Sequence, residues 1–510
     1  MKNTNINKIL SIILILSTCI ILFSSCSKAS NDAAPPMSGY YNNSIGGESY
    51  TEIVENPFVN TADNPSSYFS IDANTTSYPN LRRLINQGYT TQGHSIPKDA
   101  VRVEEMLNYF DYDYKTPDNG EVLALNASLF DTPYNSETKL LTIGLAAQSV
   151  EFSTVKNNLV FLIDVSGSMY SADKLPLVQQ AFMMLAENLN PEDRVSIVTY
   201  ASGDAVVLSG AYGYEKQKII AAIEDLTAGG STAGSAGITK AYELAAQHFI
   251  AGGNNRVILA TDGDFNVGIT NNDELERLIA EKSKSGVYFS GFCVGSGNVK
   301  FDRMETLALK GNGVCSYIDS VKEAKRALVT AIGGSMITVA KDVKAGITFN
   351  PEYVESYRLI GYENKLLTQE EFENSETDAG ELGSGHTVTV VYELKMTDKA
   401  FAEGENIADV IIKYKPTENV GGDATTEQEI TLGVGTDVYH AELTENDTFV
   451  ASVVEFALIL RDSEYKADSN LDLMYARLAA LDLSDDEFKT EFKHLIEKYS
   501  ANVGQIPPAP

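Results

Sequence analysis

Phe161-Leu-Ile-Asp-Val-Ser-Gly-Ser-Met169 decides the fold, because an apolar run stops abruptly at Asp164 and two hydroxyls follow, at Ser166 and Ser168. Residues 158–163 carry no charge and are rich in Leu, Val, Phe and Ile, which is typical of a central parallel strand covered on both faces. Open α/β sheets bind their ligands at the carboxyl ends of such strands. The three oxygen-bearing side chains alternate along a tight turn, so they can converge on one hard cation, Mg²⁺, Mn²⁺ or Ca²⁺.

Two further stretches offer oxygen donors of the same kind. The Gly-rich loop over residues 229–234 can present the Thr232 hydroxyl just before a helix. Residues 256–261 form a second apolar strand that ends in Asp262-Gly263-Asp264.

Three motifs follow one another in the chain: Asp-x-Ser-x-Ser, a Gly-Ser-Thr loop and Thr-Asp-Gly. In this order they resemble the metal-ion-dependent adhesion site of a von Willebrand factor type A domain. Ser, Gly and Asp are ordinary turn residues, so the order of the motifs, each after a strand, makes the resemblance specific. The resemblance implies that water molecules complete the coordination, and that Asp264 and Asn266 lie near enough to support the ligands. A solvated loop or a helix cap explains these last two residues equally well. The implied metal ligands are Asp164, Ser166, Ser168, Thr232 and Asp262.

The expected function follows from the charge of this ligand set. Only Asp164 and Asp262 are anionic, so a divalent ion keeps Lewis acidity and an exchangeable water. In the family that the motifs resemble, a carboxylate of a partner protein replaces that water. We therefore expect a binding or adhesion protein, not an enzyme, that captures an exposed Asp or Glu of a protein partner through Mg²⁺, with Mn²⁺ or Ca²⁺ as alternatives.

Two other functions stay open. One is a carbohydrate-binding or envelope scaffold protein whose metal site is structural. The other is a metal-dependent hydrolase. Phosphoryl-transfer sites that begin with an Asp at the end of a first strand need a second acid two residues later, and here that position is Ser166. A serine nucleophile would need a positioned base, and the histidines fall in no recognisable motif. They are His94, His248, His386, His440 and His494.

The composition sets the class of partner. The chain has 510 residues, room for more than one core, and an ordinary balance of 43% hydrophobic and 21% charged residues. Its formal net charge is −31, and no block of Lys and Arg offers a footprint for nucleic acid. Nucleic acid is therefore an unfavourable partner.

The amino-terminal residues predict export. In residues 1–25, Lys2 and Lys8 precede an apolar run over 9–23 that is short for a membrane span. Phe-Ser-Ser-Cys, ending at Cys26, resembles a bacterial lipoprotein box, which implies a lipid anchor on that cysteine. We expect an exported protein, anchored to the cell membrane or the outer membrane and facing away from the cytoplasm. Residues 26–51, rich in Ser, Asn, Gly and Pro, predict a disordered tether.

The remaining chain divides into an N-terminal flanking segment (52–153), a type A domain (154–336), a β-rich segment (337–440) and a helical segment (441–510). Strands that alternate with helices over 154–336 predict an α/β fold with a doubly wound, mainly parallel sheet. Because strands flank this domain on both sides, we expect it to be inserted in a β-sandwich-like domain. Residues 57–59, 68–74 and 102–110 resemble the segment that precedes the type A domain in a family of bacterial lipoproteins.

Two local features complete the expectations. Cys293 and Cys315 fall on neighbouring predicted strands, where they form either a disulfide or, as we prefer, two buried thiols that pack as small hydrophobes. Ser484-Asp-Asp-Glu487 predicts a capping box at the start of the last helix.

Overall fold

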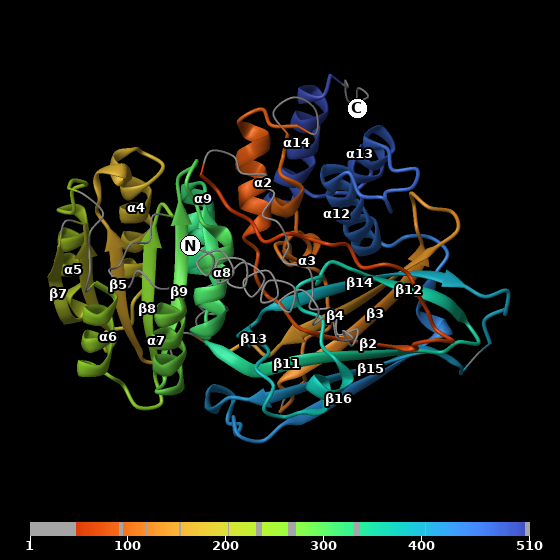
Figure 1. Cartoon of the computed structure of the whole chain (residues 1–510), viewed down its shortest axis with the longest axis horizontal. Helices are drawn as coiled ribbons and strands as arrows, with labels where there is room; N and C mark the ends of the chain where they lie inside the picture. Colours follow the sequence, from red (N-terminus) through yellow and green to blue (C-terminus); the bar gives the residue numbers. More distant parts are fainter. Residues whose placement is uncertain are drawn as a thin grey trace, which may run out of the picture. The chain divides into compact units, whose positions relative to one another are not determined.

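The computed structural model describes residues 47–90, 95–118, 120–151, 155–201, 203–230, 237–263, 272–330, 337–402 and 404–504. Within these residues a mixed α/β sheet with helices on both faces adjoins two further sheets and a layer of helices (Figure 1). The predicted fold class is confirmed. No helix in the described part of the chain combines the length and the apolar character that crossing a bilayer requires.

The α/β sheet has the strand order β10-β9-β8-β5-β6-β7, and every neighbouring pair is parallel except β6 and β7. The central strand β5 is buried at every position, as its uncharged apolar run predicts. The strands are β5 (Asn157–Asp164), β6 (Arg194–Tyr200), β7 (Asp204–Tyr212), β8 (Asn254–Thr261), β9 (Val287–Val294) and β10 (Cys315–Ile318).

Successive residues of β5 supply two cores, because side chains alternate between the faces of a strand. Leu159 and Phe161 pack with α4, α5 and α9, whereas Val160 and Leu162 pack with α6, α7 and α8. The helices are α4 (Leu175–Glu187), α5 (Lys216–Glu224), α6 (Gly237–Gln247), α7 (Asn272–Lys284), α8 (Phe301–Lys310) and α9 (Val321–Lys325), and the short turns are η3 (Gly167–Tyr170), η4 (Gly213–Glu215) and η5 (Arg326–Thr330).

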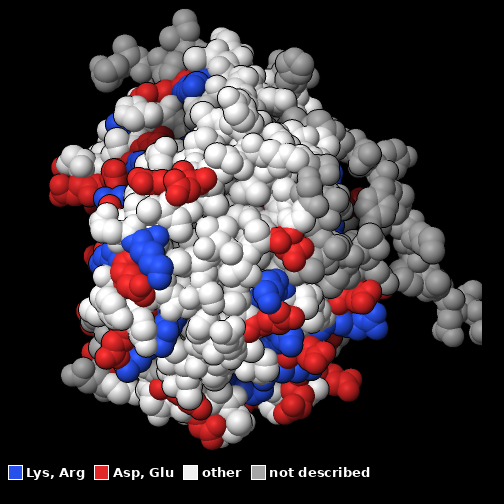
Figure 2. Space-filling model, turned by 90° about the vertical axis from the view of Figure 1, so that its left-hand side faces the viewer, with Lys and Arg blue, Asp and Glu red and all other residues white. Residues whose placement is uncertain are grey.

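The outer strand β7 lies at one end of this sheet, where Val206 and Val207 are exposed. Figure 2 shows this face, on which Lys and Arg lie among Asp and Glu around a broad uncharged centre. No continuous basic surface is drawn among the described residues of that face.

Two further sheets enclose a second core. One has the order β1-β12-β14-β4-β3-β17, and the other β13-β11-β15-β16 with β2 also paired to β11. β4 precedes the α/β sheet in the chain and β14 follows it, yet they pair over Lys139–Ala146 and Thr387–Leu394. The α/β sheet is therefore inserted between strands of one sandwich. The strands are β1 (Val59–Asn60), β2 (Ser66–Ser70), β3 (Leu123–Asp131), β4 (Lys139–Ala147), β11 (Thr338–Phe349), β12 (Val354–Ile360), β13 (Gly380–Gly383), β14 (Thr387–Met396), β15 (Asn406–Pro416), β16 (Gln428–Gly435) and β17 (Tyr439–His440).

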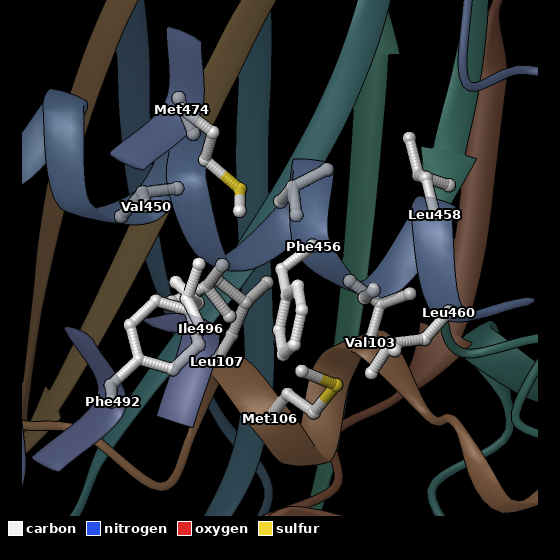
Figure 3. Packing of buried hydrophobic residues seen from close by; sticks show 14 of the residues in the cluster. Val103, Met106, Leu107, Val450, Phe456, Leu458, Leu460, Met474, Phe492 and Ile496 are labelled. Carbon is white, nitrogen blue, oxygen red and sulfur yellow. The ribbon is translucent and has the colours of Figure 1, made fainter. Parts of the chain in front are cut away.

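A layer of helices from both ends of the chain covers the outer face of the first sheet, where Leu140 and Val391 meet it. Figure 3 shows part of this core, with Phe456 beside Met106 and Leu107. The helices are α2 (Ser77–Asn86), α3 (Val103–Leu107), α12 (Glu445–Arg461), α13 (Leu471–Ala479) and α14 (Glu487–Asn502); the shorter segments are η1 (Lys98–Ala100), α11 (Gln369–Glu373), η6 (Glu418–Val420) and η7 (Thr436–Val438).

Two local expectations have clear outcomes. The predicted capping box is wrong, since the N-cap of α14 is Asp486, whose carboxylate accepts from the backbone N–H groups of Phe488 and Lys489. The Ser484 hydroxyl instead donates to Asp482. Cys293 and Cys315 are buried free thiols, so the predicted thiol state is confirmed and the disulfide is not formed.

Residues 47–50 differ from the expected tether, because they bind the α/β domain. The Glu48 carboxylate is fully buried and accepts hydrogen bonds from Gly297 N–H (2.7 Å), Arg83 Nη2 (2.9 Å) and the Tyr50 hydroxyl (2.7 Å). Gly47 N–H donates to the Gly297 carbonyl (2.6 Å). The low hydrophobicity of this segment predicts disorder, but buried charge pairing holds its last residues in place.

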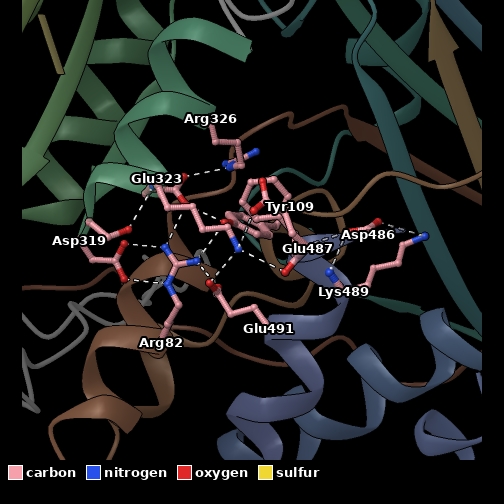
Figure 4. A network of polar contacts seen from close by, with 12 residues as sticks. Arg82, Tyr109, Asp319, Glu323, Arg326, Asp486, Glu487, Lys489 and Glu491 are labelled. Atoms are coloured by element: carbon pink, nitrogen blue, oxygen red, sulfur yellow. Dashed lines mark hydrogen bonds and ion pairs between the residues drawn. The ribbon is translucent and has the colours of Figure 1, made fainter. Parts of the chain in front are cut away.

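A network of buried charges joins α2 to α9 and α14 (Figure 4). The Arg82 guanidinium contacts Asp319 (2.5 Å), Glu323 (3.0 Å) and Glu491 (2.5 Å), and the Tyr109 hydroxyl donates to Glu323 (2.6 Å). Asp319, which follows β10, and Glu323 on α9 are almost completely buried. One arginine therefore pairs with acids from two segments that are distant in the sequence, 319–323 and α14.

We expect Arg82→Ala to lower the free energy of unfolding by about 3–5 kcal/mol, because it leaves the buried Asp319 carboxylate without its ion-pair partner. Urea denaturation followed by circular dichroism measures this loss. Lys98→Ala is the control, since Lys98 and Asp462 form an ion pair that is more than half exposed, and it should leave the midpoint almost unchanged. Equal losses in both variants would contradict the role of Arg82.

A second buried cluster lies where α3 meets α8. Burial, with repulsion from Glu305 next, raises the pKa of Glu105 from 4.5 to about 8, in spite of the nearby Arg102. Folded Glu105 therefore keeps its proton over a pH range in which the unfolded chain has lost it. The folded state binds more protons between pH 4.5 and 8, so this group makes stability fall as pH rises through that window.

Glu105→Gln imitates the protonated side chain, and its amide oxygen can still accept from Ser77 N–H, which lies 2.8 Å from the native carboxylate. We expect the variant to be more stable than the wild type at pH 8 and to differ little at pH 4.5. Melting temperatures over pH 4.5–8.5 test this. A parallel pH dependence in the two proteins would show that Glu105 is ionised in the fold.

Candidate metal centre

The carboxyl ends of β5 and β8 place two acids side by side. The strands are parallel neighbours in which Ile163 pairs with Ala260, so Asp164 and Asp262 emerge at the same edge of the sheet. Both side chains are buried. Neighbouring parallel strands deliver acids from distant parts of the chain to one point, and this is the usual ligand-binding edge of an open α/β sheet.

The turn after β5 folds back over Asp164. Its carboxylate oxygen Oδ1 accepts from Ser166 N–H (2.8 Å), and the Ser166 and Ser168 hydroxyls lie 3.0 Å apart. Ser166 is buried and Ser168 is exposed, while the buried Met169 anchors the turn in the core. The turn thus presents two hydroxyls next to a carboxylate, with one of them open to solvent.

Hydrogen bonds fix the second oxygen of Asp164. Oδ2 accepts from the Thr261 hydroxyl (3.2 Å) and the Tyr200 hydroxyl (3.3 Å). Burial raises the pKa of Asp164 to about 6, and the nearby Asp262 charge adds to this rise, while hydrogen bonds from Ser166 oppose it. The two carboxylates therefore repel one another in a poorly solvated place.

The two carboxylate oxygens of Asp262 have different surroundings. Oδ2 pairs with the Lys174 ammonium at 2.7 Å, whereas Oδ1 is buried and has no hydrogen-bond partner among the residues that the structure describes. An unsatisfied buried carboxylate oxygen is costly unless something binds it. Two close carboxylates, neighbouring hydroxyls and this oxygen fit a hard divalent cation.

The described part of the chain brings four of the five predicted ligands together: Asp164, Ser166, Ser168 and Asp262. The fifth, Thr232, lies outside the described residues, as do Asp264, Asn266 and Cys26. The start of the Thr232 loop does reach the turn, because Gly229 N–H donates to the Val165 carbonyl (2.8 Å) and Gly167 N–H to the Gly230 carbonyl (3.1 Å). No group of three or more His, Cys, Asp and Glu that could hold a metal occurs among the described residues, so the candidate site depends on hydroxyl donors.

Sequence reasoning missed three residues of the site. Tyr200 and Thr261 end the strands on either side of β5 and orient Asp164. Their position at strand ends beside Asp164 was an available signal once the sheet order was assumed. Lys174 had no such signal, because a lysine before a helix is an ordinary surface residue.

Gly263 lets the loop after β9 pack behind Asp262. Its backbone has a φ of +110°, and a Cβ there would lie 2.3 Å from the Asn298 carbonyl oxygen. Any other residue would strain the backbone and push Asp262 away from its place.

We expect Gly263→Ala to destabilise the protein by more than the cost of the left-handed conformation alone, which is about 1–3 kcal/mol. Gly252→Ala is the matched control, because Gly252 also has a positive φ but nothing lies within 4 Å of its Cβ position. Thermal unfolding compares the two. Equal losses of stability in the two variants would mean that the loop at Asn298 moves aside without an energetic penalty.

Comparison with known proteins assigns the α/β part to a class. Residues 158–329 match the family model of the von Willebrand factor type A domain, and residues 44–142 match one described as von Willebrand factor. The sheet and its carboxyl-edge site therefore belong to a type A domain, the kind of domain that supports protein–protein interaction or adhesion.

The flanking segments place the whole chain more narrowly. Residues 334–501 match the model described as "Uncharacterized protein YfbK, C-terminal". The chain is 36% identical over 472 residues to Uncharacterized protein YfbK of Escherichia coli (strain K12), which covers 88% of this chain and 80% of that relative. The protein belongs to the YfbK family.

Two other similarities are more distant. Inter-alpha-trypsin inhibitor heavy chain H4 of Homo sapiens is 29% identical over 206 residues, which are 35% of this chain and 21% of that protein. The solved structure of a von Willebrand factor type A protein from Catenulispora acidiphila has a TM-score of 0.42 and 17% identity, and the match covers 76% of this chain and 91% of that one.

Proposed function

We propose that this protein captures an acidic side chain of a protein partner through a divalent cation, Mg²⁺ before Mn²⁺ or Ca²⁺, at the Asp164 site. The observation that carries the proposal is the meeting of Asp164, Ser166, Ser168 and Asp262 at one sheet edge, where Asp262 Oδ1 is buried and no described residue gives it a hydrogen bond. When bound, the cation supplies a Lewis-acidic position for a carboxylate. Its expected protein ligands are these four residues and Thr232.

The chain's own groups prepare that position. Thr261 and Tyr200 hold Oδ2 of Asp164, which leaves the orientation of this carboxylate fixed before a cation arrives. Ser168 is exposed, and the neighbouring Tyr170 is 82% exposed, so a partner can contact the tyrosine ring beside the site. An exposed aromatic ring is a frequent anchor in protein interfaces.

Binding without turnover is part of the proposal. The Ser166 and Ser168 hydroxyls hydrogen-bond one another rather than a base that could activate them. Export and a lipid anchor on Cys26 also belong to it, and they rest on the amino-terminal sequence. A protein held in this way would offer its type A domain to partners in the cell envelope.

We expect Asp164→Ala and Ser168→Ala to lose Mg²⁺ binding in isothermal titration calorimetry, with at least a tenfold weaker affinity, because each removes an oxygen donor. The same variants, and the wild type in EDTA, should fail to retain a partner from envelope extract that the wild type retains in Mg²⁺. Glu192→Ala is the control, since this exposed acid stands at the amino end of β6, away from the site.

Wild-type affinity for Mg²⁺ in both variants would exclude this metal site. Retention of the partner that is insensitive to EDTA and to both substitutions would instead assign binding to the sandwich. Hydrolysis of a phosphate or ester substrate that vanishes with the same substitutions would replace the binding role by a catalytic one.

A further inference from the structure

The ammonium group of Lys174 lies in the candidate metal site. Lys174 precedes α4, and its Nζ is 2.7 Å from Asp262 Oδ2, with 15% of the lysine side chain and 1% of the aspartate side chain exposed. This ion pair is shielded from water far more than an ordinary surface pair. Its positive charge stands beside one of the two carboxylates that a cation would need.

The backbone provides a path for the lysine stem. Gly295 follows β9 with a φ of +74°, and a Cβ at this position would lie 2.5 Å from Cε and 2.8 Å from Cγ of Lys174. The start of the stem is also fixed, because Lys174 N–H donates to the Ser171 carbonyl (3.0 Å) and its carbonyl accepts from Val178 N–H (2.9 Å). The side chain therefore crosses from the turn to Asp262 over a glycine that leaves it room.

We propose that Lys174 is a built-in counter-ion, whose ammonium holds Asp262 Oδ2 and opposes any cation that binds at the other oxygen, Oδ1. This inference rests on the proposed metal-binding function. Two close, buried carboxylates repel one another, and the ammonium offsets part of that repulsion. A cation bound at Oδ1 also comes close to this positive charge, so Lys174 weakens the affinity for every cation.

The test compares Lys174→Met, which keeps the stem and removes the charge, with the wild type. We expect Lys174→Met to bind Mg²⁺ and Mn²⁺ about tenfold more tightly, since it loses a nearby positive charge that opposes binding. Calorimetry measures Mg²⁺, and the electron paramagnetic resonance signal of free Mn²⁺ provides a second measurement. In EDTA the variant should melt at a lower temperature than the wild type, and Mg²⁺ should raise its melting temperature more.

Two controls isolate the position of the charge. Lys156→Met makes the same change at an exposed lysine just before the amino end of β5, at the opposite edge of the sheet, and should leave metal affinity unchanged. Lys174→Arg keeps a cation next to Asp262 and should not tighten binding. If Lys174→Met does not fold by circular dichroism, Lys174→Gln repeats the test with a polar, uncharged side chain.

The outcomes separate this inference from the function on which it rests. If the wild type binds metal and the uncharged variants bind with equal or lower affinity, Lys174 is not a competitor and the inference is overturned, while the metal site stands. If neither the wild type nor the variants bind metal, both proposals fail. Tighter binding in Lys174→Met together with unchanged binding in Lys156→Met supports the inference.

Discussion

Two buried carboxylates of like charge, Asp164 and Asp262, are the constraint on which the type A domain depends. Parallel pairing of β5 and β8 forces them together, because both acids terminate neighbouring strands. Such a pair is tolerated only with hydrogen bonds and a positive charge nearby. Asp164 receives its hydrogen bonds from the turn at Ser166 and from the hydroxyls of Thr261 and Tyr200. The positive charge is the ammonium of Lys174, which pairs with Asp262.

Much of this arrangement could be predicted from the sequence. The uncharged run before Asp164 specifies a strand buried on both faces, and the second run before Asp262 specifies its partner. The resemblance to the type A motif then predicts that the carboxyl ends of these two strands lie close together. The predicted insertion in a sandwich also holds, because strands on both sides of the domain carry period-2 patterns, and β4 and β14 pair directly.

What escaped prediction depends on contacts between residues distant in the chain. Lys174 reaches Asp262 only because the turn returns across Gly295, and nothing in the local sequence specifies that path. Glu48 lies in a segment of tether-like composition, yet Arg83 and the Gly297 backbone bind its carboxylate. At α14, Ser484 and Asp486 both satisfy the N-cap pattern, so only the position of the helix start decides between them.

Buried ion pairs join the type A domain to its flanking segments. Arg82 pairs with Asp319 and Glu323, and Arg102 pairs with Glu305. Such pairs add little net stability relative to an apolar contact of the same size, since desolvation offsets the attraction, but each is costly to break singly. The candidate metal edge lies on the domain that these pairs hold, and the arginines that hold it come from the N-terminal flanking segment.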